Sequence, residues 1–124
     1  MTHDDLIRTV TEAVRAHDGW PRRLRRAVAQ GGLAVPADAI ACGAHCGFGQ
    51  WLDDLQADPD IAHAPEFRRL VTAHTVLHVE AGRIAAMVEA GDCQQAHAAL
   101  CGPSLEQATR ALSEAGAEWS AVTM

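Results

Sequence analysis

The chain has 124 residues, of which 48% are hydrophobic and 21% charged, and its net charge is −6 with an isoelectric point near 5.5. This length and composition predict one globular domain over residues 1–124, and the negative charge excludes a general attraction to nucleic acid or to an anionic membrane. Tyrosine is absent and alanine is abundant, which favours an all-α fold.

No stretch of the sequence approaches the roughly 20 apolar residues of a membrane span, and the acidic N-terminal segment lacks the features of a secretory signal. We therefore expect a cytoplasmic protein. In that reducing compartment Cys42, Cys46, Cys93 and Cys101 are predicted to be free thiols or metal ligands. Their spacing contains no C-x-x-C pair, which argues against a conventional zinc finger.

The first predicted helix covers residues 4–28, where apolar residues recur at steps of three and four. His17 and Trp20 lie on its buried side. Gly19 and Pro21 disturb the helix, because a proline ring clashes with the carbonyl four residues earlier and removes one backbone hydrogen bond. We therefore predict a kink or a break beside His17.

A second helix is predicted from Pro36 to about Leu55. It places Cys46 and Gly49 on one face, and it places Cys42 one turn before Cys46. A glycine at this position lets a neighbouring helix approach the thiol closely, since it has no side chain. The Asp- and Pro-rich stretch that follows is predicted to be a loop with room for a short turn of its own.

The third predicted helix is long and runs over about residues 67–88, for about six turns. His74 and His78 lie one turn apart on its core face. Gly91 is its expected stop, and Asp92 is the expected cap of the segment that follows.

The last segment of the chain breaks at Gly102 and Pro103. After this break, Ser104 with Gln107 could form a capping box for a helix that continues to about Trp119. Four antiparallel helices joined by short connections are the simplest arrangement of all these elements. The sequence thus predicts an antiparallel four-helix bundle.

Four side chains on these helices are of types that bind zinc: His17, Cys46, His74 and His78. Zinc accepts imidazole nitrogen and thiolate sulfur in a tetrahedron, so this set could complete a shell in the bundle core. The alternative is that two histidines four residues apart are merely buried and hydrogen-bonded. Burying three histidines and a thiol without a metal would carry a heavy desolvation cost, which favours the zinc site.

The same residues lie in three motifs: H-D-G-W from His17, C-G-F-G-Q-W from Cys46, and H-T-V-L-H from His74. In order and spacing these motifs resemble the signature of the chemoreceptor zinc-binding (CZB) domain family, over about residues 3–119. The resemblance implies a four-helix bundle that binds one zinc through the three histidines and the cysteine. It also implies a cytoplasmic regulatory module, often dimeric, that is commonly fused to a chemoreceptor or a diguanylate cyclase.

In such proteins, zinc occupancy or oxidation of the zinc-bound thiolate changes the output, which connects the domain to signal transduction, chemotaxis and redox sensing. Two features of this sequence depart from the family pattern. The 124 residues include no output domain, so we expect a stand-alone member that acts through a homodimer or a signalling partner. The sequence H-D-G-W-P also places helix-breaking residues around His17, and we expect that loss of metal moves the first helix.

Zinc would hold Cys46 as a thiolate, which is the form that oxidants convert to sulfenic acid. A disulfide with a nearby thiol could follow, and Cys42 is the nearest candidate in sequence. Two residues one turn apart on a regular helix rarely meet disulfide geometry, so we expect Cys42 to be a packing or surface residue.

The remaining polar and aromatic residues are predicted to have structural or surface roles. A basic cluster is expected to form a solvated helix face and comprises Arg22, Arg23, Arg25 and Arg26. Histidines outside the motifs are expected on the surface, with His45 as a reserve ligand, and these are His3, His45, His63 and His97. The tryptophans are expected to pack around the metal (Trp20 and Trp51) or at the far end of the bundle (Trp119).

The favoured function is a zinc-binding sensory or regulatory module, and a purely structural zinc-stabilised interaction protein is the alternative. A metal-dependent enzyme is disfavoured, since a closed four-ligand shell leaves no open position and H-T-V-L-H lacks the glutamate of a zinc protease. A di-iron carrier is disfavoured because it requires bridging carboxylates. We expect no enzymatic activity.

Overall fold

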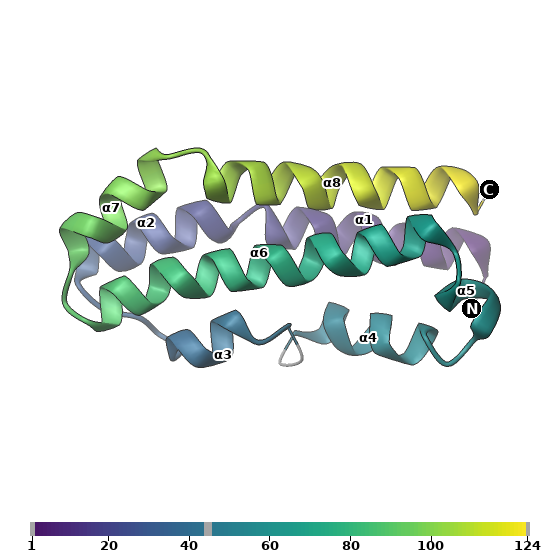
Figure 1. Cartoon of the computed structure of the whole chain (residues 1–124), viewed down its shortest axis with the longest axis horizontal. Helices are drawn as coiled ribbons and strands as arrows, with labels where there is room; N and C mark the ends of the chain where they lie inside the picture. Colours follow the sequence, from purple (N-terminus) through teal and green to yellow (C-terminus); the bar gives the residue numbers. More distant parts are fainter. Residues whose placement is uncertain (1, 44–45, 124) are drawn as a thin grey trace.

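The computed structural model describes residues 2–43 and 46–123, and these residues form helices and connections without a strand. The helices are α1 (His3–His17), α2 (Trp20–Gln30), α3 (Ala37–Ala41), α4 (Gly47–Leu55), α5 (Pro59–Ala62), α6 (Pro65–Glu89), α7 (Cys93–Cys101) and α8 (Ser104–Val122). The predicted all-α class is therefore confirmed (Figure 1).

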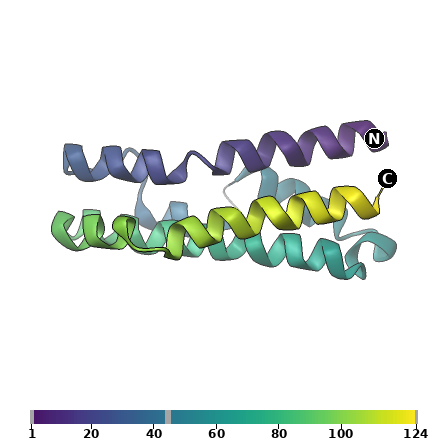
Figure 2. The ribbon, with the colours of Figure 1, turned by 90° about the horizontal axis from the view of Figure 1, so that it is seen from above.

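The helices lie in an elongated bundle around α6, the longest of them. Helices α1 and α2 follow each other along the long axis, as do α3 and α4, and as do α7 and α8 (Figures 1 and 2). Helix α6 packs against α2, α3, α4, α7 and α8, while α1 packs against α8. Residues on α6 therefore face several other segments at once, which makes this helix the natural carrier of a site in the core.

The predicted break in the first helix is confirmed. Helix α1 ends at His17, and α2 begins at Trp20 with Pro21 in its first turn, where a proline needs no N–H partner. Asp18 and Gly19 connect the two helices, and the separation is visible in Figure 2. The break leaves His17 as the last residue of α1.

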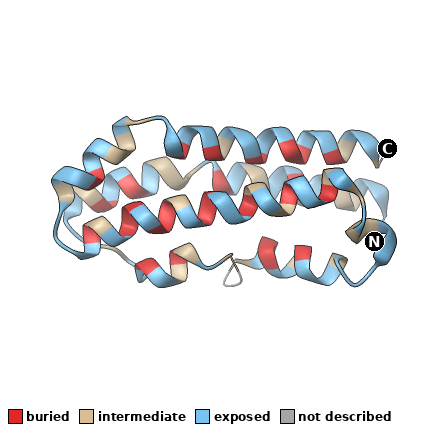
Figure 3. Cartoon of the chain, in the orientation of Figure 1, coloured by how far each residue is buried: buried red, intermediate tan, exposed pale blue. Residues whose placement is uncertain are grey.

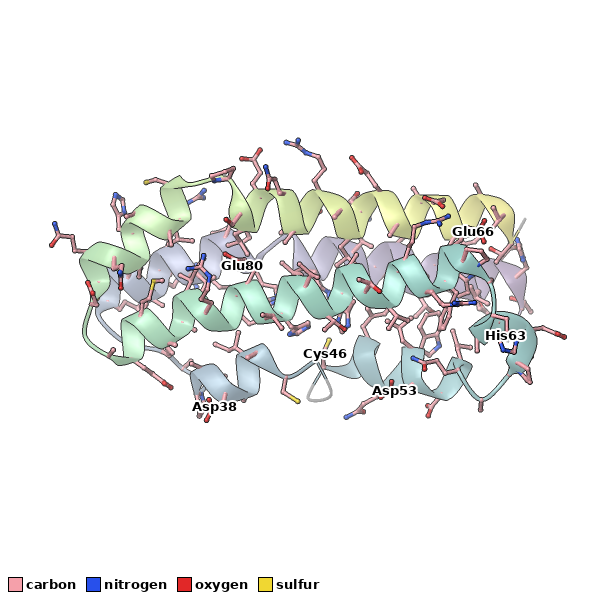
Figure 4. The ribbon with its side chains drawn as sticks, in the orientation of Figure 1. Asp38, Cys46, Asp53, His63, Glu66 and Glu80 are labelled. Atoms are coloured by element: carbon pink, nitrogen blue, oxygen red, sulfur yellow. The ribbon has the colours of Figure 1, made fainter. Side chains whose placement is uncertain are left out.

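The prediction of one helix from Pro36 to Leu55 is wrong. Helix α3 ends at Ala41, Cys42 has extended backbone angles (φ −91°, ψ 107°), and α4 begins only after Cys46 (φ −94°, ψ 132°). Cys46 is thus the N-cap of α4 rather than a residue inside a helix, and Cys42 is not one turn before it on a regular helix. The interruption turns the Cys46 side chain toward α6, as Figure 4 shows.

The expectations for the connections are confirmed in part. The loop before α6 contains the short helix α5, α6 ends at Glu89 before Gly91 (φ 80°), and the Asp92 side chain accepts a hydrogen bond from the Gln95 N–H. The capping box at Ser104 is wrong, because Pro103 already has helical backbone angles and is itself the N-cap. Ser104 therefore lies inside the first turn of α8.

The core lies along the inward faces of α6 and α8, where buried positions recur at helical spacing (Figure 3). Trp119 is 2% exposed, and its ring lies 5.3 Å from that of Phe67 and 6.3 Å from that of Trp51. On the other side of α6, a Cβ atom at Gly82 would overlap Ala41. A glycine is needed there because α3 crosses α6 in direct backbone contact.

Candidate metal centre

The structure brings the four predicted ligands together. One side-chain atom from each of His17, Cys46, His74 and His78 lies within 4.8 Å of the others. The three histidines are 3–5% exposed, and Cys46 is partly buried. Among the residues that the structure describes, no other group of three or more His, Cys, Asp or Glu side chains is close enough to hold a metal ion.

Three separate segments position the cluster. His74 and His78 lie one turn apart in the middle of α6, on the face that the other helices cover. His17 reaches the cluster from the end of α1, and Cys46 reaches it from the start of α4. His17 is the last residue of α1, and Cys46 is the N-cap of α4. The breaks between α1 and α2 and between α3 and α4 therefore bring these two side chains to α6.

The hydrogen bonds of two imidazoles fix which nitrogen faces the cluster. Nδ1 of His17 lies 2.7 Å from the carbonyl oxygen of Ala13, and Nδ1 of His78 lies 2.9 Å from that of Ile40. A carbonyl can only accept, so each Nδ1 carries the hydrogen and each Nε2 of the neutral ring presents a lone pair. Backbone acceptors that orient a ligand histidine in this way are the usual outer shell of a metal site.

These two lone pairs point at each other. The Nε2 atoms of His17 and His78 are 3.2 Å apart, and two acceptors cannot form a hydrogen bond. Nε2 of His74 is buried and is the one buried side-chain nitrogen or oxygen without a partner among the described residues. An unpartnered buried nitrogen costs roughly 1–3 kcal/mol. A metal cation bound by these nitrogens would relieve the contact between the two acceptors and would give Nε2 of His74 a partner.

Two of the six separations between the four ligand atoms agree with a tetrahedral zinc shell, and all six are within 4.8 Å. With Zn–N bonds of about 2.05 Å and a Zn–S bond of about 2.3 Å, two nitrogens lie about 3.3 Å apart and a nitrogen lies about 3.6 Å from the sulfur. The observed separations are 3.2 Å between Nε2 of His17 and Nε2 of His78, and 3.5 Å between Sγ of Cys46 and Nε2 of His17. The donor set of three imidazoles and one thiol therefore suits zinc in both chemistry and size.

The surroundings also favour the charge states that bind a metal. Burial raises the pKa of the Cys46 thiol, but the contacts of its sulfur with the neighbouring imidazoles outweigh this effect and lower the pKa to about 3. Burial lowers the pKa of His74, which keeps that ring neutral. The pKa of His78 is raised, because its contacts with Cys46 and with the Ile40 carbonyl outweigh the opposing effect of burial. The cluster thus presents a thiolate at neutral pH.

Residues 17–85, more than half of the chain, match the family model described as the chemoreceptor zinc-binding domain. The chain belongs to the CZB domain family. The matched range begins at His17 and includes the whole cluster, whereas the sequence resemblance was expected to extend over about residues 3–119. No curated protein and no solved structure matches the sequence significantly. Among the described residues, no helix is both long and apolar enough to span a bilayer.

Gly49 of the CZB motif has a different role from the one predicted. A Cβ atom there would overlap the carbonyl oxygen of Gly43 and would lie 3.2 Å from Cε1 of His74. The backbone that comes close is therefore the connection between α3 and α4, rather than a neighbouring helix. Gly43 itself would bring a Cβ atom to 3.3 Å from the same Cε1. Two glycines thus let this connection lie against the His74 ring.

Phe48 is a part of the site that the sequence reasoning did not single out. Its buried ring makes edge contacts with His74 (5.2 Å between centroids) and with His17 (5.9 Å). Trp51 stacks on Phe48 at 5.7 Å, so Phe48 lies between this tryptophan and the histidines. The available signal was the apolar position between the cysteine and the second glycine of the C-G-F-G motif. Trp20 contacts the site directly, with its ring 6.2 Å from that of His78.

The other polar residues lie away from the cluster. His3, His63 and His97 are exposed, as predicted, while the proposed reserve ligand His45 lies outside the described residues. The four arginines of α2 are also exposed, as predicted. One of them, Arg23, has its guanidinium 5.0 Å from the centre of the Trp20 ring.

Proposed function

We propose that this CZB domain is a zinc-binding sensory or regulatory module in which His17, Cys46, His74 and His78 hold one Zn²⁺ per chain. In this proposal residues 1–124 form a single domain, an antiparallel four-helix bundle with interrupted helices and the zinc in its core. The observation that carries the proposal is the 3.2 Å contact between two Nε2 lone pairs, since both rings already donate Nδ1–H to backbone carbonyls.

Bound zinc would hold the Cys46 sulfur as a thiolate and would join three segments of the chain through their side chains. Other residues of the chain orient the ligands and cover the site. Ala13 and Ile40 hold the two rings in the binding tautomer through their carbonyls, and Phe48 covers the site. Loss of the metal would leave three buried imidazoles without their common partner, so occupancy changes the stability of the junctions at His17 and Cys46.

A sensing role is favoured over a purely structural one by the accessibility of the thiol. Cys46 is partly buried rather than sealed, and it lines a cavity together with His78. A thiolate that solutes can reach can respond to an oxidant, whereas an enclosed structural thiolate is inert. We propose that the response passes to a second copy of the chain or to another cytoplasmic signalling protein. Because four protein ligands close the shell, the proposal assigns no catalytic activity to it.

The test is zinc content and affinity of the purified protein beside two variants. Cys46→Ser removes the sulfur ligand, and Cys42→Ser makes the same change at an exposed cysteine outside the cluster. We expect one zinc per chain in the wild type and in Cys42→Ser, and an affinity weakened by roughly 10–100-fold or more in Cys46→Ser. Equal zinc affinity in all three proteins would refute the shell.

A further inference from the structure

A cavity of about 630 Å³ lies between α2 and α3 and extends to the metal cluster. Its walls include Trp20, Leu24 and Ala27 from α2, and Ala39 and Ile40 from α3. Cys46, His17 and His78 form one end, and the connection between α2 and α3 covers another part through residues 32–35. Figure 1 shows these two helices on either side of α6, and the cavity occupies the seam between them.

The charged side chains that α2 and α3 contribute to the cavity lining are both arginines. Arg23 and Arg26 both line it, and no Asp or Glu is among its described lining residues. This is unexpected in a chain with 16 acidic residues and a net charge of −6. Neither arginine has a carboxylate partner among the described residues, whereas Arg8, Arg69 and Arg83 each form an ion pair.

One of these arginines lies against an aromatic ring. The Arg23 guanidinium lies over the Trp20 ring, 5.0 Å from its centre, and both side chains line the cavity. A guanidinium held on an aromatic face keeps its N–H donors free for an anion in the plane of the group. The cavity thus combines an oriented cation with apolar walls.

We propose that this cavity binds a small organic carboxylate, with the carboxylate at Arg23 and Arg26 and the apolar body against Leu24, Ala27 and Ile40. The cavity volume lies within the range of small-molecule sites, which are mostly apolar with a few polar groups that fix orientation. Arginine is suited to a carboxylate because its planar fork can donate two parallel hydrogen bonds. An inorganic anion would leave the apolar walls uncovered. This ligand site is additional to the proposed zinc shell.

The test is binding of sodium octanoate to the zinc-loaded protein, measured by calorimetry and by tryptophan fluorescence, with octanamide as the neutral analogue of equal length. We expect saturable octanoate binding and much weaker octanamide binding. Arg23→Gln and Arg26→Gln should each weaken octanoate binding roughly tenfold, as expected when a charge-assisted hydrogen bond is lost. Ala39→Phe, which fills the cavity, should abolish it.

The matched controls lie on the same helix. Arg22→Gln and Arg25→Gln remove the same charge from exposed positions of α2 that do not line the cavity, and both should bind octanoate like the wild type. The zinc content of every variant is measured in parallel, so that failure of the metal site is recognised separately. Equal binding of octanoate and octanamide, or equal weakening by all four arginine variants, would overturn the proposal. Loss of octanoate binding as the protein self-associates would assign the cavity to a second copy of the chain and would also overturn it.

Discussion

Gly49 lies against the carbonyl of Gly43 so closely that a Cβ atom at position 49 would overlap it. The same Cβ atom would lie 3.2 Å from the His74 ring, so one added methyl group would push on the connection that carries Cys46 and on a proposed ligand together. The position of the connection between α3 and α4 and the position of the His74 ring therefore both depend on a glycine at position 49.

Gly49→Ala is therefore expected to weaken zinc binding and to lower the free energy of unfolding by roughly 1–3 kcal/mol, the usual cost of overpacking. Chemical denaturation and zinc titration measure the two effects. The control is Gly47→Ala, two residues earlier in the first turn of α4, where a Cβ atom would meet nothing within 4 Å. Equal behaviour of the two variants would contradict the close approach of Gly43 and Gly49.

Zinc removal is expected to loosen the junction between α1 and α2. His17 is the single proposed ligand from this part of the chain, and Asp18 and Gly19 after it lie outside both helices. Trypsin should therefore cleave faster after the exposed arginines of α2 once a chelator has removed the metal. Cleavage after Arg83 on α6 serves as the internal reference, since α6 carries two of the proposed ligands. Unchanged relative cleavage in α2 would show that the junction does not depend on zinc.

The pH dependence of zinc affinity should reflect the histidines rather than the thiol. Zinc binds deprotonated ligands, so a proton must leave any ligand that is protonated in the metal-free protein. The pKa of Cys46 is lowered to about 3, and no proton is displaced from it at neutral pH. The pKa of His78 is raised, so its proton is the first to compete as pH falls, whereas the lowered pKa of His74 delays competition there.

Above the pH at which His78 releases its proton, affinity should therefore be nearly flat, and below that pH it should fall as His78 and then His74 become protonated. A competition titration with a zinc indicator, corrected for the protonation of the indicator itself, gives the profile. A thiol with the ordinary pKa of about 8.5 would instead lose close to tenfold in affinity for each pH unit below that value. Such a slope would contradict the thiolate state of Cys46.

Oxidation of Cys46 should release the metal. Attack of the thiolate on hydrogen peroxide forms sulfenic acid and releases hydroxide, and the oxidised sulfur is a poorer ligand. Peroxide should therefore liberate zinc from the wild type and equally from Cys42→Ser, with release measured by a colorimetric indicator and the oxidised residue identified by mass spectrometry. Slower release from Cys42→Ser would show instead that Cys42 takes part, as the resolving thiol of a disulfide.

The sequence was sufficient to predict the meeting of His17, Cys46, His74 and His78, because each belongs to one of three motifs whose order and spacing resemble the CZB signature. The break at His17 was also predictable, since Gly19 and Pro21 mark it in the sequence. The break before Cys46 was not predicted, because no proline lies between Ala37 and Cys46 and the apolar spacing continues through it, although Gly43 and Gly47 weaken a helix there. It arises from tertiary contacts, namely the approach of the connection to Gly49 and His74.

The outer contacts of the site were beyond sequence reasoning for a similar reason. The acceptors for His17 and His78 are backbone carbonyls of Ala13 and Ile40, and a backbone group has no residue type to recognise. The capping box at Ser104 failed because Pro103 adopts helical angles itself, which shifts the helix start by one residue. The motifs were thus sufficient to predict the ligand side chains, whereas the backbone groups that contact them could be identified only from the structure.

X-ray absorption spectroscopy of the zinc-loaded protein is the sharpest test of the proposed four-ligand shell, because it identifies the ligand atoms around the metal. We expect one sulfur at about 2.3 Å and three nitrogens at about 2.0–2.1 Å, with the sulfur contribution lost in Cys46→Ser and retained in Cys42→Ser. A shell of nitrogen and oxygen alone, or one with two sulfurs, would contradict this expectation.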